Sequence, residues 1–165
     1  MGRRFFPVYM DLDGNNCGIM GGGETAARCA QALLHFGARL TVVSPVLCPA
    51  LQELERQGLV RHIPRKFFRG DCSHMLLCIA ATGDRAVNIA IASECKAKNL
   101  PVYVTDPVEY GTFRFPAVLH HGEVTVTLAG DGVHTPQREY GSLLRHAAPR
   151  CSRIFRAAAD CRNTP

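Results

Sequence analysis

The chain has 165 residues, of which 47% are hydrophobic and 20% charged, and this composition excludes a disordered chain. The formal net charge is +5, but the basic residues are scattered and form no run of five or six, which argues against an arm that binds nucleic acid. No apolar stretch approaches the length of a membrane span. We therefore expect one ordinary globular domain with a small appendage, and neither nucleic acid nor a membrane as its partner.

The eight cysteines include no C-x-x-C pair. The first residues lack the apolar core of a secretory signal, so we expect a cytoplasmic protein with reduced thiols rather than a disulfide framework. Cys17, Cys78 and Cys95 lie inside apolar or helical runs, where a free cysteine behaves as a small hydrophobic residue. Because the ligand spacing of a structural zinc site is absent, the sequence predicts no metal site.

The first two thirds of the chain alternate predicted strands and helices. We expect strands over residues 6–12, 17–20, 40–43, 60–64, 75–81 and 101–105, and helices over residues 25–36, 48–57 and 85–98. Gly37 and Gly58 stand where the first two helices should end. The alternation predicts an α/β fold, with a Rossmann-like parallel sheet, right-handed crossovers and helices on both faces.

The pattern changes near residue 113. Residues 113–119 and 123–128 read as two strands separated by His120, His121 and Gly122, which predicts a small β-hairpin with the two histidines at its tip. A helix is expected over residues 137–146, and the pattern fades from residue 147. The sequence thus predicts a dinucleotide-binding domain over residues 1–112, a hairpin segment over 113–146 and a frayed tail over 147–165.

A glycine-rich turn follows the strand predicted over residues 17–20. It has the form G-x-G-x-x-A, from Gly21 through Gly23 to Ala26, and a helix-forming run follows it. Such glycines let the backbone turn sharply and approach a pyrophosphate, and a side chain at Gly23 would occupy the place of the phosphate. The start of the helix would direct free N–H groups and a positive dipole end at the phosphates. Five consecutive residues are therefore candidates for cofactor binding: Gly21, Gly22, Gly23, Glu24 and Thr25. A glycine turn without a ligand is the alternative.

Further candidates follow the later strands, because ligands of open α/β sheets bind beyond the carboxyl ends of the strands. Ser44 and Pro45 follow the strand predicted over residues 40–43, and Ala80, Ala81 and Thr82 lie at the end of the strand predicted over residues 75–81. An NAD site usually carries an acidic residue at the position of Ser44. A serine can bind the ribose without repelling a 2′-phosphate, so the residues leave NAD and NADP open, and a plain turn role for Ser44 is equally consistent.

Asp106 ends the strand predicted over residues 101–105 and precedes Pro107. A carboxylate at this edge of the sheet could move a proton while a hydride leaves to the cofactor. Aspartate before proline is also common in simple turns, and the residue types alone favour that simpler role.

Taken in order, the motifs resemble the precorrin-2 dehydrogenase family, which forms the N-terminal module of siroheme synthases. The resemblance covers residues 6–145 and rests on segments 7–12, 21–28, 37–45, 79–88 and 113–117. It implies a Rossmann domain that binds NAD, followed by a segment that pairs two copies of the chain into a homodimer. It also implies oxidation of precorrin-2 to sirohydrochlorin, with Asp106 as the catalytic acid or base. Some family members are credited with inserting iron or cobalt into the product.

The resemblance adds two candidate residues for the carboxylate-rich tetrapyrrole, Arg114 and His134. His134 lies in a loop where this chain departs from the family, since Ala129 stands where a serine is usual and the loop is one residue longer. Two other readings therefore remain open. The chain could be a dinucleotide-binding module without catalysis, or a chelatase that does not oxidise its tetrapyrrole.

Overall fold

The computed structural model describes residues 5–121 and 124–128. The chain divides into two compact units, one spanning Phe5–Arg114 and one that includes the hairpin after Phe115. Each unit is considered by itself. The first unit contains every predicted cofactor residue and Asp106, so it is the unit that positions the candidate site.

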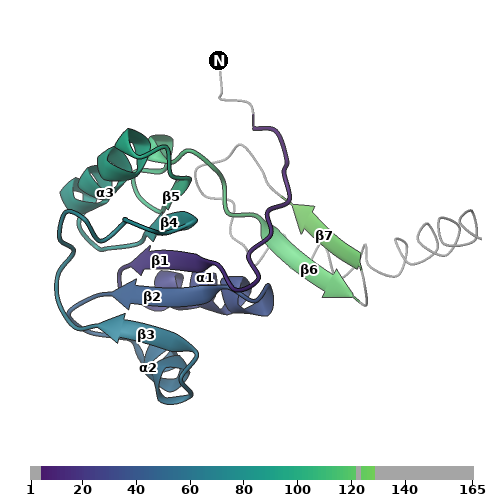
Figure 1. The fold of residues 1–165 in the computed structure, drawn as a ribbon, viewed down its shortest axis with the longest axis horizontal. Helices are drawn as coiled ribbons and strands as arrows, with labels where there is room; N and C mark the ends of the chain where they lie inside the picture. Colours follow the sequence, from purple (N-terminus) through teal and green to yellow (C-terminus); the bar gives the residue numbers. More distant parts are fainter. Residues whose placement is uncertain (1–4, 122–123, 129–165) are drawn as a thin grey trace, which may run out of the picture. The chain divides into compact units, whose positions relative to one another are not determined.

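The first unit is built on a parallel sheet of five strands (Figure 1). The strands are β1 (Asn16–Met20), β2 (Arg39–Val43), β3 (Val60–Ile63), β4 (Leu77–Ala80) and β5 (Val102–Val104). Their order across the sheet is β3-β2-β1-β4-β5, and every neighbouring pair is parallel. The order reverses beside β1, which creates the switch point at which α/β sheets bind ligands. The predicted Rossmann-like sheet is confirmed.

Three helices connect the strands: α1 (Glu24–His35), α2 (Pro49–Arg56) and α3 (Arg85–Ala97). A short 3-10 helix, η1 (Val108–Tyr110), follows β5. Because α1 and α2 join strands that advance in one direction across the sheet and α3 joins strands that advance in the other, right-handed crossovers put α3 on the opposite face (Figure 1). All three predicted helices are found within about two residues of their expected ends.

Local chemistry explains how these helices begin and end. At the start of α3, the Asp84 carboxylate accepts hydrogen bonds from the backbone N–H groups of Ala86 and Val87, at 2.8 and 3.3 Å. This is the cap expected of an aspartate before a helix. After α1, Gly37 adopts a φ of 76°, and a Cβ there would collide with the Asp13 carboxylate. Glycine is therefore required at this helix end, as the sequence predicts.

The core lies on both faces of the two central strands. Ile19 in β1 and Ile79 in β4 are fully buried, and so are Leu51 in α2 and Ile91 in α3. Strand β4 lies between β1 and β5 in the sheet, and all four of its residues are buried. This burial explains why residues 77–80 form an unbroken apolar run. No helix in the described part of the chain is long and apolar enough to cross a membrane.

The strand predicted over residues 6–12 is wrong. These residues form no strand, and Phe6 is 86% exposed and Tyr9 79% exposed. The physical reason is that β1 already pairs with β2 on one side and β4 on the other, so no central edge is left for a further strand. Leu12 is buried, and the Leu12 carbonyl accepts a hydrogen bond from the Asn15 N–H in the turn that leads into β1.

In the second unit, β6 (Ala117–His121) pairs antiparallel with β7 (Val124–Leu128). The expected hairpin tip is wrong in detail, because His120 and His121 belong to β6 and lie in register with Thr125 and Val124. The strand therefore runs two residues further than its apolar pattern indicates. The predicted helix over 137–146 and the tail over 147–165 lie outside the described residues, and the dimerising role of the hairpin stays a prediction.

The core assignment leads to a matched stability prediction. Leu51→Ala removes a fully buried side chain and should lower the free energy of unfolding by about 2–5 kcal/mol. Leu59→Ala makes the same chemical change at a position that is 47% exposed, and it should cost about 1 kcal/mol or less. Denaturant unfolding of both variants measures the difference. Equal losses for the two would contradict the assigned packing of α2.

Candidate functional site

The glycine turn between β1 and α1 is fixed to the loops that follow β2 and β4. The Gly21 N–H donates to the carbonyl of Val43 at 3.0 Å, and the Gly22 carbonyl accepts from the Cys48 N–H at 2.7 Å. On the other side, the Ala81 N–H donates to the carbonyl of Met20 at 2.8 Å. Three chain segments that are distant in sequence thus meet at the carboxyl ends of the strands.

The first two glycines of the turn are required by the protein's own packing. Gly21 has a φ of 131°, and a Cβ there would overlap the carbonyl of Ala81. A Cβ at Gly22 would overlap the carbonyl of Val46 and lie 2.6 Å from the Ser44 Oγ. Neither position accepts a side chain without moving the backbone of a neighbouring loop.

Gly23 differs from both. A Cβ at this position would meet no atom of the described residues within 4 Å, and its backbone φ of −88° is accessible to any residue. Neither packing nor conformation inside the described protein therefore explains a glycine here. The space beside Gly23 fits a ligand that approaches the backbone closely, as a pyrophosphate does in dinucleotide sites.

The start of α1 supplies donors to that space. The helix begins at Glu24 with Gly23 as its N-cap, and no side chain caps it. Its first N–H groups and its positive dipole end suit a negatively charged group. Glu24 itself is exposed, and the Thr25 hydroxyl accepts a hydrogen bond from Arg28 at 3.1 Å. The residues of this turn therefore fit the phosphates of a dinucleotide.

Ser44 has a structural role at the end of β2. Its hydroxyl donates to the Val46 carbonyl at 2.8 Å, and its own carbonyl contacts the His62 Nε2 at 2.8 Å. The serine is buried, while Pro45 and Val46 beside it are exposed. The turn role considered for Ser44 is thus present. A contact of its hydroxyl oxygen with a ribose stays a prediction.

Asn88 organises the loop after β4, and it is not among the site residues that the sequence predicts. Its side chain is buried in α3, where its Oδ1 accepts from the Thr82 N–H at 3.1 Å and from the Thr82 hydroxyl at 2.6 Å. Its Nδ2 donates to the carbonyls of Thr82 and Asp106, at 3.1 and 2.7 Å. One amide therefore links the loop after β4 to the loop after β5. The sequence holds only a weak signal, since Asn88 precedes Ile91 and Ala92 by three and four residues and so shares their side of the helix.

Asp106 lies just beyond β5, where its side chain is 62% exposed. The Thr105 N–H before it donates to the Ala80 carbonyl at 3.0 Å, which continues the sheet up to the aspartate. One carboxylate oxygen lies 3.6 Å from the Arg85 Nε, in an exposed ion pair of small energetic value. The Asn88 amide thus holds the backbone of Asp106 in place, while the Asp106 carboxylate stays accessible to a substrate.

Of the two residues expected to contact the tetrapyrrole, the structure describes only Arg114. Arg114 donates to the Val108 carbonyl at 3.2 Å, and its guanidinium lies 4.9 Å from the ring centre of Phe5. Its buried Nε has no hydrogen-bond partner among the described residues. His134 lies outside the described residues. The structure therefore brings Gly21–Thr25, Ser44, Ala80–Thr82 and Asp106 to one edge of the sheet, and substrate contacts by Arg114 and His134 stay predictions.

Comparisons with known proteins agree with this geometry. Residues 8–117 match the family described as "Putative NAD(P)-binding". The chain is 37% identical over 128 residues to a siroheme synthase of Chromobacterium violaceum, covering 78% of this chain and 27% of that protein. It is 34% identical over 160 residues to a siroheme synthase of Methylococcus capsulatus, covering 96% of this chain and 34% of that protein. The chain thus spans about a quarter to a third of the length of these relatives.

A solved structure is also similar to the chain. It is titled "SirC, precorrin-2 dehydrogenase", and it matches with a TM-score of 0.70 and 26% sequence identity. The match covers 86% of this chain and 71% of that one.

The glycine turn gives a paired prediction. Gly23→Ala should leave the free energy of unfolding within about 1 kcal/mol of the parent, because the new methyl group meets no protein atom. It should weaken NAD binding about tenfold or more, because the methyl group enters the ligand's space. Gly22→Ala should instead cost about 1–3 kcal/mol of stability through overlap with the Val46 carbonyl. Calorimetry and denaturant unfolding measure both effects, and unchanged NAD binding by Gly23→Ala would remove the evidence for this pyrophosphate site.

The amide of Asn88 gives a second prediction. Asn88→Asp keeps the size of the side chain and its acceptor for the Thr82 N–H, but it loses both donations to carbonyl oxygens. The carbonyls of Thr82 and Asp106 then face a carboxylate at the buried Asn88 position, so the free energy of unfolding should fall by about 2 kcal/mol or more. Denaturant unfolding at neutral pH tests this. A variant as stable as the parent would show that the amide does not hold the two loops together.

Proposed function

The chain belongs to the precorrin-2 dehydrogenase and siroheme synthase N-terminal domain family, and from this membership we propose that it acts as an oxidoreductase in siroheme biosynthesis. The proposed reaction is the NAD-dependent oxidation of precorrin-2 to sirohydrochlorin, at a CH–CH bond. The observation that carries the proposal is the glycine turn. Protein atoms leave no room for a Cβ at Gly21 or Gly22, whereas there is open space beside Gly23. A glycine turn with room beside Gly23, at the switch point of a Rossmann sheet, supports a dinucleotide cofactor.

The loop after β2 favours NAD over NADP. Sites for NADP usually place an arginine where it can bind the 2′-phosphate. Residues 44–48 carry no basic side chain, and the buried Ser44 hydroxyl already donates to the Val46 carbonyl. A second phosphate at this position would have no charged partner in the loop. The chemistry of this loop, rather than the family match, therefore supports NAD as the preferred cofactor.

In the proposed reaction the substrate loses a hydride and a proton. When bound, NAD supplies the hydride acceptor. Asp106 takes the proton, since its carboxylate is exposed at the end of β5 and its backbone is anchored by the Asn88 amide. Asn88 is a positioning residue that acts through the Asp106 backbone. The start of α1 orients the dinucleotide by its free N–H groups.

We also propose that the substrate is the carboxylate-rich precorrin-2 and that the working form is a homodimer paired through β6 and β7. The net charge of +5 suits a polyanionic substrate. Among the described residues, Arg114 is the cation that we propose to bind a substrate carboxylate. Its guanidinium donates a hydrogen bond to the Val108 carbonyl, and its Nε has no hydrogen-bond partner among the described residues. The hairpin supports the dimer, since a two-stranded sheet on its own is marginally stable in water.

The direct experiment is an anaerobic assay of the purified chain with precorrin-2, run with NAD and NADP in parallel. Asp106→Asn should lower kcat by about 100- to 10,000-fold, the range of a lost acid–base group, and should leave NAD affinity unchanged. Glu109→Gln makes the same change in an exposed carboxylate three residues away, and it should keep parental turnover.

The outcomes separate three functions. Turnover that survives in Asp106→Asn would show that another group moves the proton. A parent chain that binds NAD and forms no sirohydrochlorin would be a dinucleotide-binding module without catalysis. Insertion of iron or cobalt into added sirohydrochlorin, without oxidation of precorrin-2, would identify a chelatase.

A further inference from the structure

Three cysteines from separate parts of the sequence meet in the core of the first unit. Cys72 comes from the turn before β4, Cys78 from β4 and Cys95 from α3, and all three are fully buried. Their Sγ atoms lie within 4.8 Å of one another. None of the three forms a disulfide. Their spacing follows no short ligand motif, so the fold reveals a cluster that the sequence did not.

The turn that carries Cys72 is held on α3 by polar contacts. The Gly70 N–H donates to both carboxylate oxygens of Glu94 at 3.0 Å, and the Lys98 ammonium donates to Glu94 and to the Ser73 hydroxyl at 2.7 Å. Burial would raise the pKa of Glu94, but hydrogen bonds from Lys98 and the Gly70 N–H outweigh it and hold that pKa below its ordinary value. These contacts fix the position of Cys72 without any bond between sulfurs.

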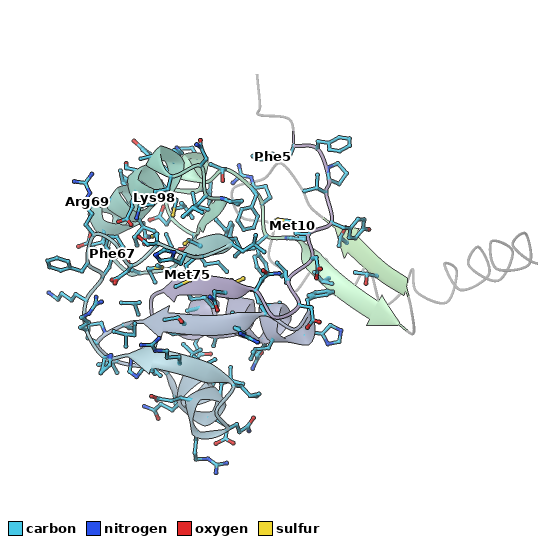
Figure 2. The ribbon with its side chains drawn as sticks, viewed as in Figure 1. Phe5, Met10, Phe67, Arg69, Met75 and Lys98 are labelled. Carbon is cyan, nitrogen blue, oxygen red and sulfur yellow. The ribbon has the colours of Figure 1, made fainter. Side chains whose placement is uncertain are left out.

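Two thioether side chains lie in the same region. At Gly18 in β1, an added Cβ would come within 3.2 Å of the Met20 Cε, 3.4 Å of the Met75 Cγ and 3.6 Å of the Cys78 Sγ. Because Gly18 has no side chain, the side chains of Met20, Met75 and Cys78 can pack close to its backbone. Met20 belongs to the same buried cluster as the three cysteines, and Met75 packs against it. Figure 2 shows Met75 and Lys98 in the part of the molecule that contains α3.

We propose that Cys72, Cys78 and Cys95 bind one Cu(I) ion. Sulfur ligands select soft metals such as Cu(I) and zinc, but structural zinc sites require four ligands. No histidine, aspartate, glutamate or fourth cysteine joins the group within the described part of the chain. Metal–sulfur bonds of about 2.3 Å in a trigonal site need sulfurs about 4 Å apart, which the cluster reaches with small movements. Any thiol proton lost on binding passes to solvent, and copper keeps its oxidation state.

The proposed metal site is separate from the dinucleotide site. On α3, Cys95 follows Asn88 by two turns, which is about 10 Å along the helix axis. The metal site stands on its own cysteine geometry and does not depend on the proposed dehydrogenase reaction. Far-ultraviolet circular dichroism, which does not depend on any cofactor, can accordingly serve as the check that a cysteine variant has kept the fold.

The test is an anaerobic titration of the full chain with Cu(I) against a competing chelator, bicinchoninate. The parent for this test carries Cys151→Ser and Cys161→Ser, which removes the two thiols near the C-terminal end. One Cu(I) per chain should bind. Cys78→Ser and Cys95→Ser should each lower the affinity by more than about 100-fold, since loss of an outer-shell group alone costs about 10- to 100-fold. Cys29→Ser is the matched control, because Cys29 is equally buried but lies in α1, and it should keep full affinity.

X-ray absorption of the Cu(I)-loaded parent tests the same site without altering its cysteines, and it should show copper surrounded by sulfur alone. Nitrogen or oxygen ligands would overturn the proposal. Copper affinity equal to that of the parent in the Cys78→Ser and Cys95→Ser variants, with the circular dichroism spectrum of the parent retained, would overturn it as well. Tighter binding of Zn²⁺ than of Cu(I) at the same cysteines would show that the assigned metal is wrong.

Discussion

The candidate site depends on the close approach of three backbone segments at the glycine turn. At Gly21 and Gly22 the turn lies so near the loops after β4 and β2 that neither position has room for a Cβ. Backbone hydrogen bonds to Val43 and from Cys48 hold this arrangement. The consequence appears one residue later, at Gly23, where the start of α1 faces open space. Two glycines close the protein around the turn, and the third leaves room for a ligand.

Helix α3 connects this edge of the sheet to the sulfur cluster. Near its beginning, the Asn88 amide holds the loops that carry Thr82 and Asp106. Near its end, Glu94 and Lys98 hold the turn that brings Cys72 to Cys95. The Asn88 amide and the Glu94 carboxylate are both buried with hydrogen-bond partners in place, which is the condition under which buried polar groups rigidify a core. A single helix therefore positions two regions of different chemistry.

Local sequence rules predict most of the first unit. Apolar runs and the glycines at helix ends, Gly37 and Gly58, identify the strands and helices, and the alternation of the elements predicts the parallel sheet. The rules fail where tertiary pairing decides the outcome. Residues 6–12 alternate like a strand, but both neighbours of β1 are already present. The roles of Asn88 and of the cysteine cluster were also not predictable, because each depends on contacts between distant segments.

In the candidate site, too, some features follow from local sequence and others depend on tertiary contacts. Its glycines and strand ends follow from spacing, whereas the difference between Gly22 and Gly23 depends on where the Val46 carbonyl lies. The same fold brings the Asp106 loop within reach of the Asn88 amide, and the residue types alone favoured a simple turn there. Spacing therefore predicts the candidate site, and the packing of backbone carbonyls distinguishes Gly23, which has open space beside it, from Gly21 and Gly22, which do not.

The central claim is that the open space at Gly23 holds the pyrophosphate of NAD at the start of α1. A crystal structure of the chain with bound NAD tests it most directly. The account predicts phosphate oxygens in contact with the Gly23 backbone and the first N–H groups of α1, with the nicotinamide on the side of Asp106. A pyrophosphate bound away from Gly23, or a nicotinamide remote from Asp106, would contradict it.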